Sequence, residues 1–242
     1  MKETHFFYVP KADVNNELPK EEIIHALKVL RLNIGDEIFL IDGKGFFYTA
    51  IISEVKGIKH CYYEIKRVIP QTPIWRNHIH LAIAPTKDIG RIEWMVEKAT
   101  EIGIDEITFL DCAFSERKTL RTDRIERIVI SAMKQSRKAW KPIINAITPL
   151  NKFIDTHIKG AHFFCHCYNE LERKDLFTEL SSISRHDQEV IVLIGPEGDF
   201  SIDEVKNLVK HWGISCSLGN SRLRTETAGL EAVMMMNLSF RL

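Results

Sequence analysis

Several features that would identify a common protein class are missing from this 242-residue chain. No apolar run approaches the length of a membrane span, and the opening residues, MKETHFFYVP, lack the apolar stretch of a secretory signal. The chain also lacks the Lys-Ser/Thr of a P-loop and the glycine fingerprint of a dinucleotide-binding strand. We therefore expect a cytoplasmic protein without a membrane partner, and a nicotinamide oxidoreductase is disfavoured.

Cysteine is scarce and scattered. The five cysteines are odd in number and lie mostly within strand-like runs, which suits buried thiols in a reducing compartment. Only Cys165-His166-Cys167 suggests a metal site, and no second Cys/His pair stands at ligand spacing from it. We therefore expect no metal.

Excess charge of one sign is also lacking, since 33 basic residues balance 33 acidic ones. The local distribution is uneven, however, because Ser115–Lys141 holds nine basic residues and only three acidic ones. Such a segment is either a footprint for a phosphate backbone or a solvated helix face with internal pairing. Charge alone does not decide between the two.

The first part of the chain is rich in predicted strands. EIFLID, FFYTAIISEV and CYYEIKRVI read as short strands joined by tight turns, and Asp42-Gly43-Lys44-Gly45 is the signal for the first hairpin. Residues 25–32 read as helical or turn-like. This pattern predicts a small β-barrel over residues 1–72. Pro70-Gln71-Thr72-Pro73 is the natural boundary to a second domain, residues 73–242.

Beyond the boundary, strands and helices alternate. Residues 78–85 and 106–112 read as strands, with a helix between them whose apolar face includes Ile92, Met95 and Val96. A second helix is expected from Thr122, followed by the apolar run IINAI, a short helix, the strand-like run HFFCHC and a polar stretch at 169–188. The alternation predicts an α/β fold with a parallel sheet.

Two segments near the end share one plan, in which an apolar strand runs into a glycine-bearing loop and then a helix. The first is LIGPEGDFS, Leu193–Ser201, with a predicted capping box from Ser201 to Glu204. The second is LGNSRLRTETAGLEA, Leu218–Ala232. Loops at the carboxyl ends of adjacent strands are where open α/β sheets bind ligands. The glycines suggest a backbone-lined pocket for a flat heterocycle.

These paired segments resemble the C-terminal signature of the small-subunit (16S) ribosomal RNA uracil-N(3) methyltransferases, which belong to the SPOUT class. The resemblance extends to RIEWMVEKATEIGIDEITFL (91–110), FSERK (114–118), KQSRKAWKP (134–142) and, near the amino terminus, HALKVLRLNIGDEIFLIDGKG (25–45). It therefore covers both predicted domains. One departure is Asp199, which stands where many members have a second glycine after GPEG.

The resemblance implies a SPOUT-type parallel sheet with a C-terminal trefoil knot, a PUA-like N-terminal barrel and S-adenosylmethionine (SAM) as cofactor. Both glycine loops would then meet at one ligand. By position, the cofactor-binding residues would be Leu193, Gly195, Pro196, Glu197, Gly198, Leu218, Gly219, Leu223, Arg224, Thr225, Thr227 and Ala228, although the leucines could instead pack beneath the loops.

Methyl transfer to a ring nitrogen requires orientation of the reactants and removal of one proton. Arg224 is the expected stabiliser of a uracil anion, and Glu197 and Glu226 are the candidate proton acceptors. Both carboxylates also suit purely local roles near a helix amino terminus. The expected RNA-binding residues are Arg31, Lys44, Glu116, Arg117, Gln135, Ser136 and Arg137, with an exposed helix surface as the alternative for the last five.

The family resemblance also implies a homodimer through the knot region, with ribosomal RNA or the small ribosomal subunit as partner. Met234, Met235 and Met236, on a helix that is apolar nearly all round, are expected at the dimer interface or in the core. Two alternatives stay open: a SPOUT enzyme that modifies another nucleotide or a ribose hydroxyl, and an inactive RNA-binding module.

Overall fold

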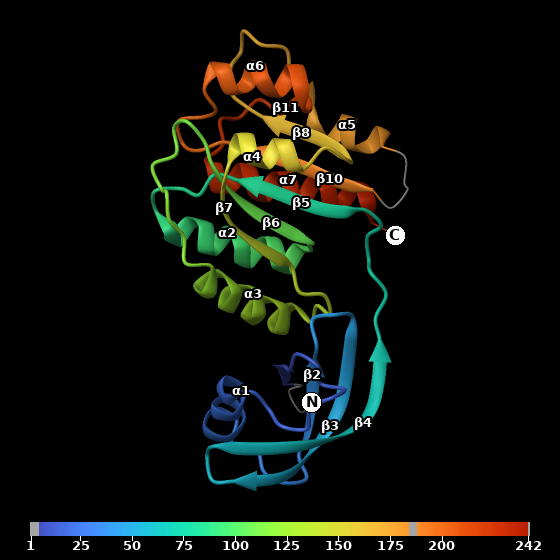
Figure 1. Cartoon of the computed structure of the whole chain (residues 1–242). Helices are drawn as coiled ribbons and strands as arrows, with labels where there is room; N and C mark the ends of the chain where they lie inside the picture. The colour runs from blue at the N-terminus through green and yellow to red at the C-terminus, as the bar shows by residue number, and fades with distance from the viewer. Residues whose placement is uncertain (1–4, 184–187, 242) are drawn as a thin grey trace. The chain divides into compact units, whose positions relative to one another are not determined.

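The computed structural model describes residues 5–183 and 188–241, which form two compact units (Figure 1). Among the described residues, the first unit comprises 5–73 and 130–141, and the second comprises 74–129, 142–183 and 188–241. The sequence analysis placed a boundary after residue 72, and the first division of the structure follows residue 73. Residues 130–141, expected in the second domain, group with the first unit.

The first unit is built on a four-stranded sheet in the order β1-β2-β3-β4. Its helical segment, α1 (Lys20–Ile24) continued by a π-helical turn (His25–Val29), covers the expected helical stretch. Alternate residues of the strands pack into one core around Phe7, Leu40 and Ile52. Among the described residues, β1 and β4 are the edges of this sheet. The strands are β1 (Phe6–Tyr8), β2 (Glu37–Ile41), β3 (Phe46–Lys56) and β4 (His60–Pro70).

The hairpin between β2 and β3 is set by one carboxylate. Asp42 Oδ1 accepts the backbone N–H groups of Lys44 (2.7 Å) and Phe46 (3.1 Å). Gly43 and Gly45 both have positive φ, and a Cβ at Gly45 would collide with the ring of Trp140. The sequence DGKG therefore specifies this turn locally, as expected.

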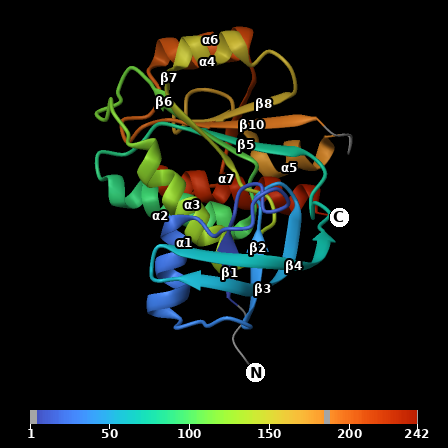
Figure 2. The ribbon, with the colours of Figure 1, turned by 60° about the horizontal axis from the view of Figure 1, so that its bottom comes forward.

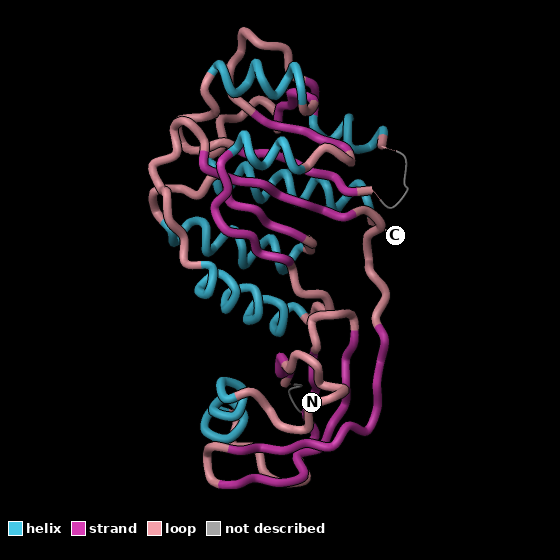
Figure 3. The backbone as a smooth tube through the Cα atoms, viewed as in Figure 1, coloured by secondary structure: helices cyan, strands magenta, loops and turns pink. Residues whose placement is uncertain are grey.

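The second unit contains a seven-stranded sheet in the order β7-β6-β5-β10-β8-β11-β9, and every pair in it is parallel. Its strands are magenta in Figure 3. The central strands are almost wholly apolar, as expected of strands covered on both faces. The strands are β5 (His78–Ile83), β6 (Glu106–Asp111), β7 (Ile143–Pro149), β8 (Ala161–Cys165), β9 (Lys174–Asp175), β10 (Glu189–Ile194) and β11 (Ile214–Ser217).

Helices cover both faces of this sheet (Figure 2). One face packs against α2, α5 and α7, and the other against α4 and α6. The expected capping box is present, because Ser201 and Glu204 exchange side-chain-to-backbone hydrogen bonds at the start of α6. The helices are α2 (Ile89–Ile102), α3 (Thr122–Ser136), α4 (Leu150–Thr156), α5 (Leu176–Ser182), α6 (Ile202–His211) and α7 (Thr225–Phe240).

The last helix, α7, returns toward the middle of the sheet. It follows β11 near one edge, yet it contacts α2, α5, β5 and β10. Its apolar residues make this possible, since Ala232, Val233 and Met236 are fully buried. Glycine is required at position 229, where α7 packs against Ile83 of β5, because a Cβ there would lie 2.7 Å from Ile83 Cδ1. This return of the C-terminal helix is the feature that a knotted fold requires.

The elements between α3 and β10 follow the expected order. IINAI lies in β7, which pairs with β6 at the sheet edge, and its β-branched residues suit a strand. The short helix expected after it is α4, and HFFC lies in β8. The polar stretch at 169–188, for which no element was predicted, contains β9 and α5, the latter capped by Asp175. Residues 184–187 lie outside the described part of the chain.

In the parts of the chain that the structure describes, no helix is both long enough and apolar enough to span a membrane.

Candidate functional site

A cavity of about 420 Å³ opens at the carboxyl ends of β8, β10 and β11. The loops that follow these three strands form its wall, and the first turn of α7 closes one side. Strand ends and helix starts therefore meet here, as expected for an α/β ligand site. The lining residues are Arg91, Cys165, His166, Cys167, Arg173, Ile194, Gly195, Pro196, Glu197, Asp199, Ser217, Leu218, Gly219, Ser221, Arg222, Leu223, Arg224, Thr225 and Ala228.

The loop after β10 is held in place by backbone contacts. Asp199 N donates to Pro196 O (2.9 Å), which closes a turn around GPEG. Glu197 Oε1 accepts the backbone N–H of Lys87 (2.9 Å), so this carboxylate ties the loop to the segment after β5. A Cβ at Gly195 would lie 3.0 Å from Phe200 N, which leaves little room for a larger residue.

The loop after β11 instead leaves open space beside its glycine. Gly219 has a φ of +107°, and a Cβ there would have no neighbour within 4 Å. The Ser217 hydroxyl bonds to both the N–H and the carbonyl of Gly219. Arg224 stands at the start of α7 with an exposed side chain, and no hydrogen bond or ion pair of its guanidinium is recorded among the described residues.

Asp199 occupies an unusual conformation for a non-glycine residue, with a φ of +67°. Its carboxylate accepts two backbone N–H groups, from Cys167 (2.7 Å) and from Phe200 (2.7 Å). Aspartate tolerates the left-handed region better than most residues. These hydrogen bonds link the loop after β10 to the loop after β8.

Charges of both signs face the cavity. Arg91, Arg173, Arg222 and Arg224 are cationic lining residues, and Glu197 and Asp199 are anionic ones. Burial lowers the pKa of His166. Partial desolvation raises the pKa of the Cys167 thiol, and the Asp199 carboxylate adds to that shift. Cys167 is exposed, whereas the other four cysteines are buried free thiols as the sequence suggested.

Comparison with known proteins gives a consistent result over both units. Residues 73–237 match the family described as an RNA methyltransferase domain, and residues 18–62 match an RNA methyltransferase PUA domain. The first match spans most of the chain. The chain belongs to the RNA methyltransferase family.

Full-length relatives agree with this assignment. Ribosomal RNA small subunit methyltransferase E of Rickettsia conorii is 28% identical, over 92% of this chain and 89% of that protein. The solved structure of a probable rRNA methyltransferase from Porphyromonas gingivalis is 39% identical, with a TM-score of 0.89 and 98% of each chain covered. A putative methyltransferase from Legionella pneumophila, solved with bound SAM, is 26% identical over 98% of each chain, with a TM-score of 0.85.

Most of the cofactor-binding residues expected for this methyltransferase line the cavity. The exceptions are Leu193, Gly198 and Thr227. Leu193 is fully buried in the core beneath α4 and α6, so its side chain packs under the loop. Gly198 lies against Phe114 and lines a neighbouring hollow, and Thr227 lines a shallow depression beside Trp94.

Several lining residues were not predicted. Arg91 comes from α2, and Cys165, His166, Cys167 and Arg173 come from β8 and the loop after it. These residues are 20 or more positions away from both glycine segments in the sequence. The parallel pairing of β8 with β10 and β11 brings the four residues of β8 and its loop to the cavity.

Of the catalytic candidates, Glu226 is the most constrained. It is buried in the first turn of α7, where Oε1 pairs with Arg91 Nη1 at 3.3 Å. Its Oε2 is buried without a hydrogen-bond partner among the described residues. An anion at a helix amino terminus is stabilised by the helix dipole as well as by this ion pair.

The expected RNA-binding residues divide between the two units. In the second unit, the Arg117 guanidinium donates to the carbonyls of Thr86 and Lys87, and Glu116 pairs with Lys87. Arg117 therefore organises the segment whose backbone binds Glu197.

In the first unit, Ser136 bonds within its own helix and Arg137 lies over the ring of Phe6. Arg31, Lys44 and Gln135 have exposed side chains.

We expect Asp199→Ala to destabilise the protein more than Asp199→Gly. Both variants lose the two accepted hydrogen bonds, but alanine must also adopt a positive φ, which costs about 1 kcal/mol. Asp199→Asn, which keeps an acceptor and tolerates this conformation, should be the mildest of the three. Urea denaturation without ligand measures the order, and equal losses for alanine and glycine would contradict the backbone argument.

Proposed function

We propose that this protein transfers a methyl group from SAM to the N3 atom of a uracil in 16S ribosomal RNA of the small ribosomal subunit. The observation that carries the proposal is the cavity formed by the two glycine loops, in a chain that belongs to the RNA methyltransferases along most of its length. The names of the full-length relatives support the small subunit as the source of the RNA.

The cavity has the chemistry that SAM requires. Ile194, Leu218 and Leu223 offer apolar walls for an adenine ring, and open space beside Gly219 allows a ligand to approach the backbone. The arginines of the lining suit a carboxylate, and Glu197 and Asp199 suit the positive charges of the ammonium and sulfonium groups. SAM bound here would supply an activated methyl group.

Arg224 is the proposed catalytic residue. Removal of the N3 proton makes uracil an anion, and an exposed guanidinium at the rim of the cavity would stabilise that charge. Glu197 and Glu226 remain candidate proton acceptors. The Lys87 N–H bond fixes the Glu197 side chain, and the Arg91 ion pair fixes the Glu226 side chain.

We expect wild-type protein with SAM to methylate 16S rRNA, and Arg224→Ala to lower the rate at least about 100-fold, as loss of an anion-stabilising group does. Mass spectrometry of nuclease digests locates the methyl group. SAM binding by the variant should persist, and it is measured as protection of the exposed Cys167 from alkylation at alkaline pH, where its raised pKa still permits the thiolate.

Arg224→Lys is the matched variant, since it keeps the charge without the planar guanidinium. An unchanged rate in Arg224→Ala would remove the catalytic role of Arg224. A methyl group on a ribose hydroxyl or on another base would overturn the proposed reaction. The assignment of the chain to the RNA methyltransferase family would still hold.

RNA binding by the first unit is proposed to use Arg31 and Lys44. Both are exposed, and Lys44 lies in the tight hairpin between β2 and β3. An exposed cation can contact phosphate, which positions RNA without reading its sequence.

We expect Arg31→Ala with Lys44→Ala to weaken RNA binding and to flatten its salt dependence by about 0.7–0.9 log units per lost phosphate contact. Filter binding at several salt concentrations measures this slope. Lys56→Ala is the control, because Lys56 already pairs with Glu54 at 3.1 Å. The same slope in the double variant and in the control would exclude a phosphate contact.

We also propose a homodimer through α7. Met236 is in the core, whereas Met234 (46% exposed) and Leu238 (52% exposed) lie four residues apart on one open face of the helix. Leu238→Asp should convert a dimer to a monomer in sedimentation velocity. Val209→Asp, at an exposed apolar site on α6, should leave the mass unchanged. A wild-type monomer would exclude the dimer.

A further inference from the structure

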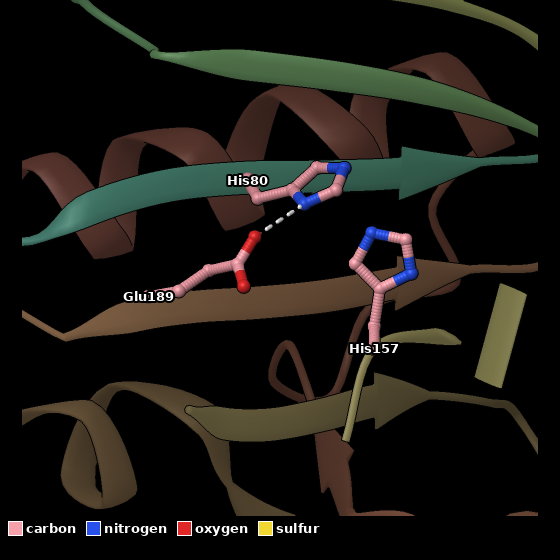
Figure 4. A group of neighbouring side chains, drawn as sticks. All are labelled: His80, His157 and Glu189. Atoms are coloured by element: carbon pink, nitrogen blue, oxygen red, sulfur yellow. Dashed lines mark hydrogen bonds and ion pairs between the residues drawn. The ribbon is translucent and has the colours of Figure 1, made fainter. Parts of the chain in front are cut away.

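A cluster of histidine and acidic side chains lies at the amino-terminal ends of β5 and β10, the opposite end of the sheet from the cavity. His80 comes from β5, Glu189 begins β10, and His157 follows the last turn of α4. Figure 4 shows the three side chains converging from these three elements. One potential ligand atom from each lies within 4.8 Å of the other two.

The hydrogen bonds of His157 define which of its nitrogens is available. Its Nδ1 lies 2.9 Å from the carbonyl oxygen of Phe153, which can only accept, so Nδ1 carries the proton. In the neutral ring, Nε2 then presents its lone pair toward the cluster (Figure 4). A backbone carbonyl that binds the far nitrogen is the usual support of a metal-ligating histidine.

His80 is fully buried, and both of its nitrogens have partners. Nε2 lies 2.8 Å from the Thr108 hydroxyl, which also accepts an N–H from Asn145 (2.8 Å). Nδ1 lies 3.0 Å from Glu189 Oε1. When Nε2 donates to Thr108, Nδ1 and the carboxylate present lone pairs to each other. A metal ion between them would accept both lone pairs, whereas without the ion the Thr108 hydroxyl donates to Nε2 and the Nδ1–H donates to Glu189.

The surroundings hold these ligands firmly. The His157 ring stacks on the Phe153 ring with 4.0 Å between their centroids, and Phe153 also makes an edge-to-face contact with the His80 ring. Trp212 Nε1 donates to the backbone carbonyl of His157 (2.9 Å). Glu189 keeps 29% of its side chain exposed, so a water molecule can reach the cluster from solvent.

We propose that His80, His157 and Glu189 bind a divalent transition-metal ion, with Zn²⁺ as the best match, and that water completes a four-coordinate shell. Two imidazoles and one carboxylate suit zinc, whereas Mg²⁺ and Ca²⁺ prefer oxygen ligands alone. The ion clamps the connection between α4 and β8 to strands β5 and β10.

The site is separate from the cofactor cavity. Glu189 and Ile194 stand at opposite ends of β10, which puts about 17 Å between them at ~3.3 Å per residue. The proposal therefore does not depend on the methyl-transfer reaction. The sequence analysis expected no metal because it weighed only Cys165-His166-Cys167, which belongs to neither of the candidate groups among the described residues.

The test is calorimetric titration of ZnCl₂ into the full chain, free of any histidine tag and stripped with a chelator. We expect one Zn²⁺ per chain, no binding of Mg²⁺, and a higher Tm with Zn²⁺ because the ion binds the folded state. Co²⁺ should give the visible absorption of a four-coordinate ion. No saturable Zn²⁺ binding to the wild type would overturn the proposal.

Two variants and one matched control identify the ligands. His157→Phe keeps the stack on Phe153 without the nitrogens, and Glu189→Gln keeps the size of the side chain. Each should weaken Zn²⁺ binding at least about 100-fold. Removal of a residue that only hydrogen-bonds to a metal ligand already lowers metal affinity about 10–100-fold. His162→Phe is the control, because His162 also stacks on an aromatic ring, that of Trp212, and lies outside the cluster.

A second group, His78, Glu106 and Glu189, shares the same carboxylate. His78→Phe should leave Zn²⁺ affinity within about threefold of the wild type, since His78 is not one of the proposed ligands. Loss of Zn²⁺ binding in His78→Phe but not in His157→Phe would show that the second group holds the ion, and it would overturn the proposal. Equal affinities in all variants would indicate adventitious surface binding and overturn it too.

Discussion

The packing of α7 beneath β5 and β10 is the constraint on which the candidate site depends. The helix is apolar enough to be buried by α2, α5 and the sheet, so its first turn is held at the carboxyl ends of the central strands. Arg224, Thr225 and Ala228 reach the cavity only because of this placement. Gly229 allows the close contact with Ile83 that the arrangement requires.

The loops of the cavity are connected by hydrogen bonds between charged side chains and backbone groups. Arg117 binds the carbonyls of Thr86 and Lys87, and the Lys87 N–H binds Glu197. Asp199 similarly joins the loops after β8 and β10. Side chains expected to contact RNA or substrate thus also shape the pocket, which preorganises it for a ligand.

The two ends of the parallel sheet have different chemistry. Glycine loops and arginines gather at the carboxyl ends, whereas histidines and glutamates gather at the amino ends of β5 and β10. Strand β10 contributes to both, through Glu189 at one end and Ile194 at the other. A parallel sheet permits this because all of its strands start at one edge and finish at the other.

Local features could be predicted from the sequence: the alternation that indicates a parallel α/β sheet, the DGKG hairpin, the capping box at Ser201 and the two glycine loops. Each depends on residues close in sequence, whose geometry is restricted by glycine, by capping or by apolar periodicity. The partner of a strand is not predictable in this way, since nothing in the short run IINAI shows that it pairs with β6.

The set of distant residues that share a site follows from the tertiary fold and not from the sequence pattern. Arg91 and Arg173 join the glycine loops at the cavity, Arg117 turns toward backbone carbonyls, and His157 meets His80 and Glu189. None of these contacts follows from sequence spacing. The order of strands in the sheet sets them, and that order results from burial of apolar surface summed over the whole second unit.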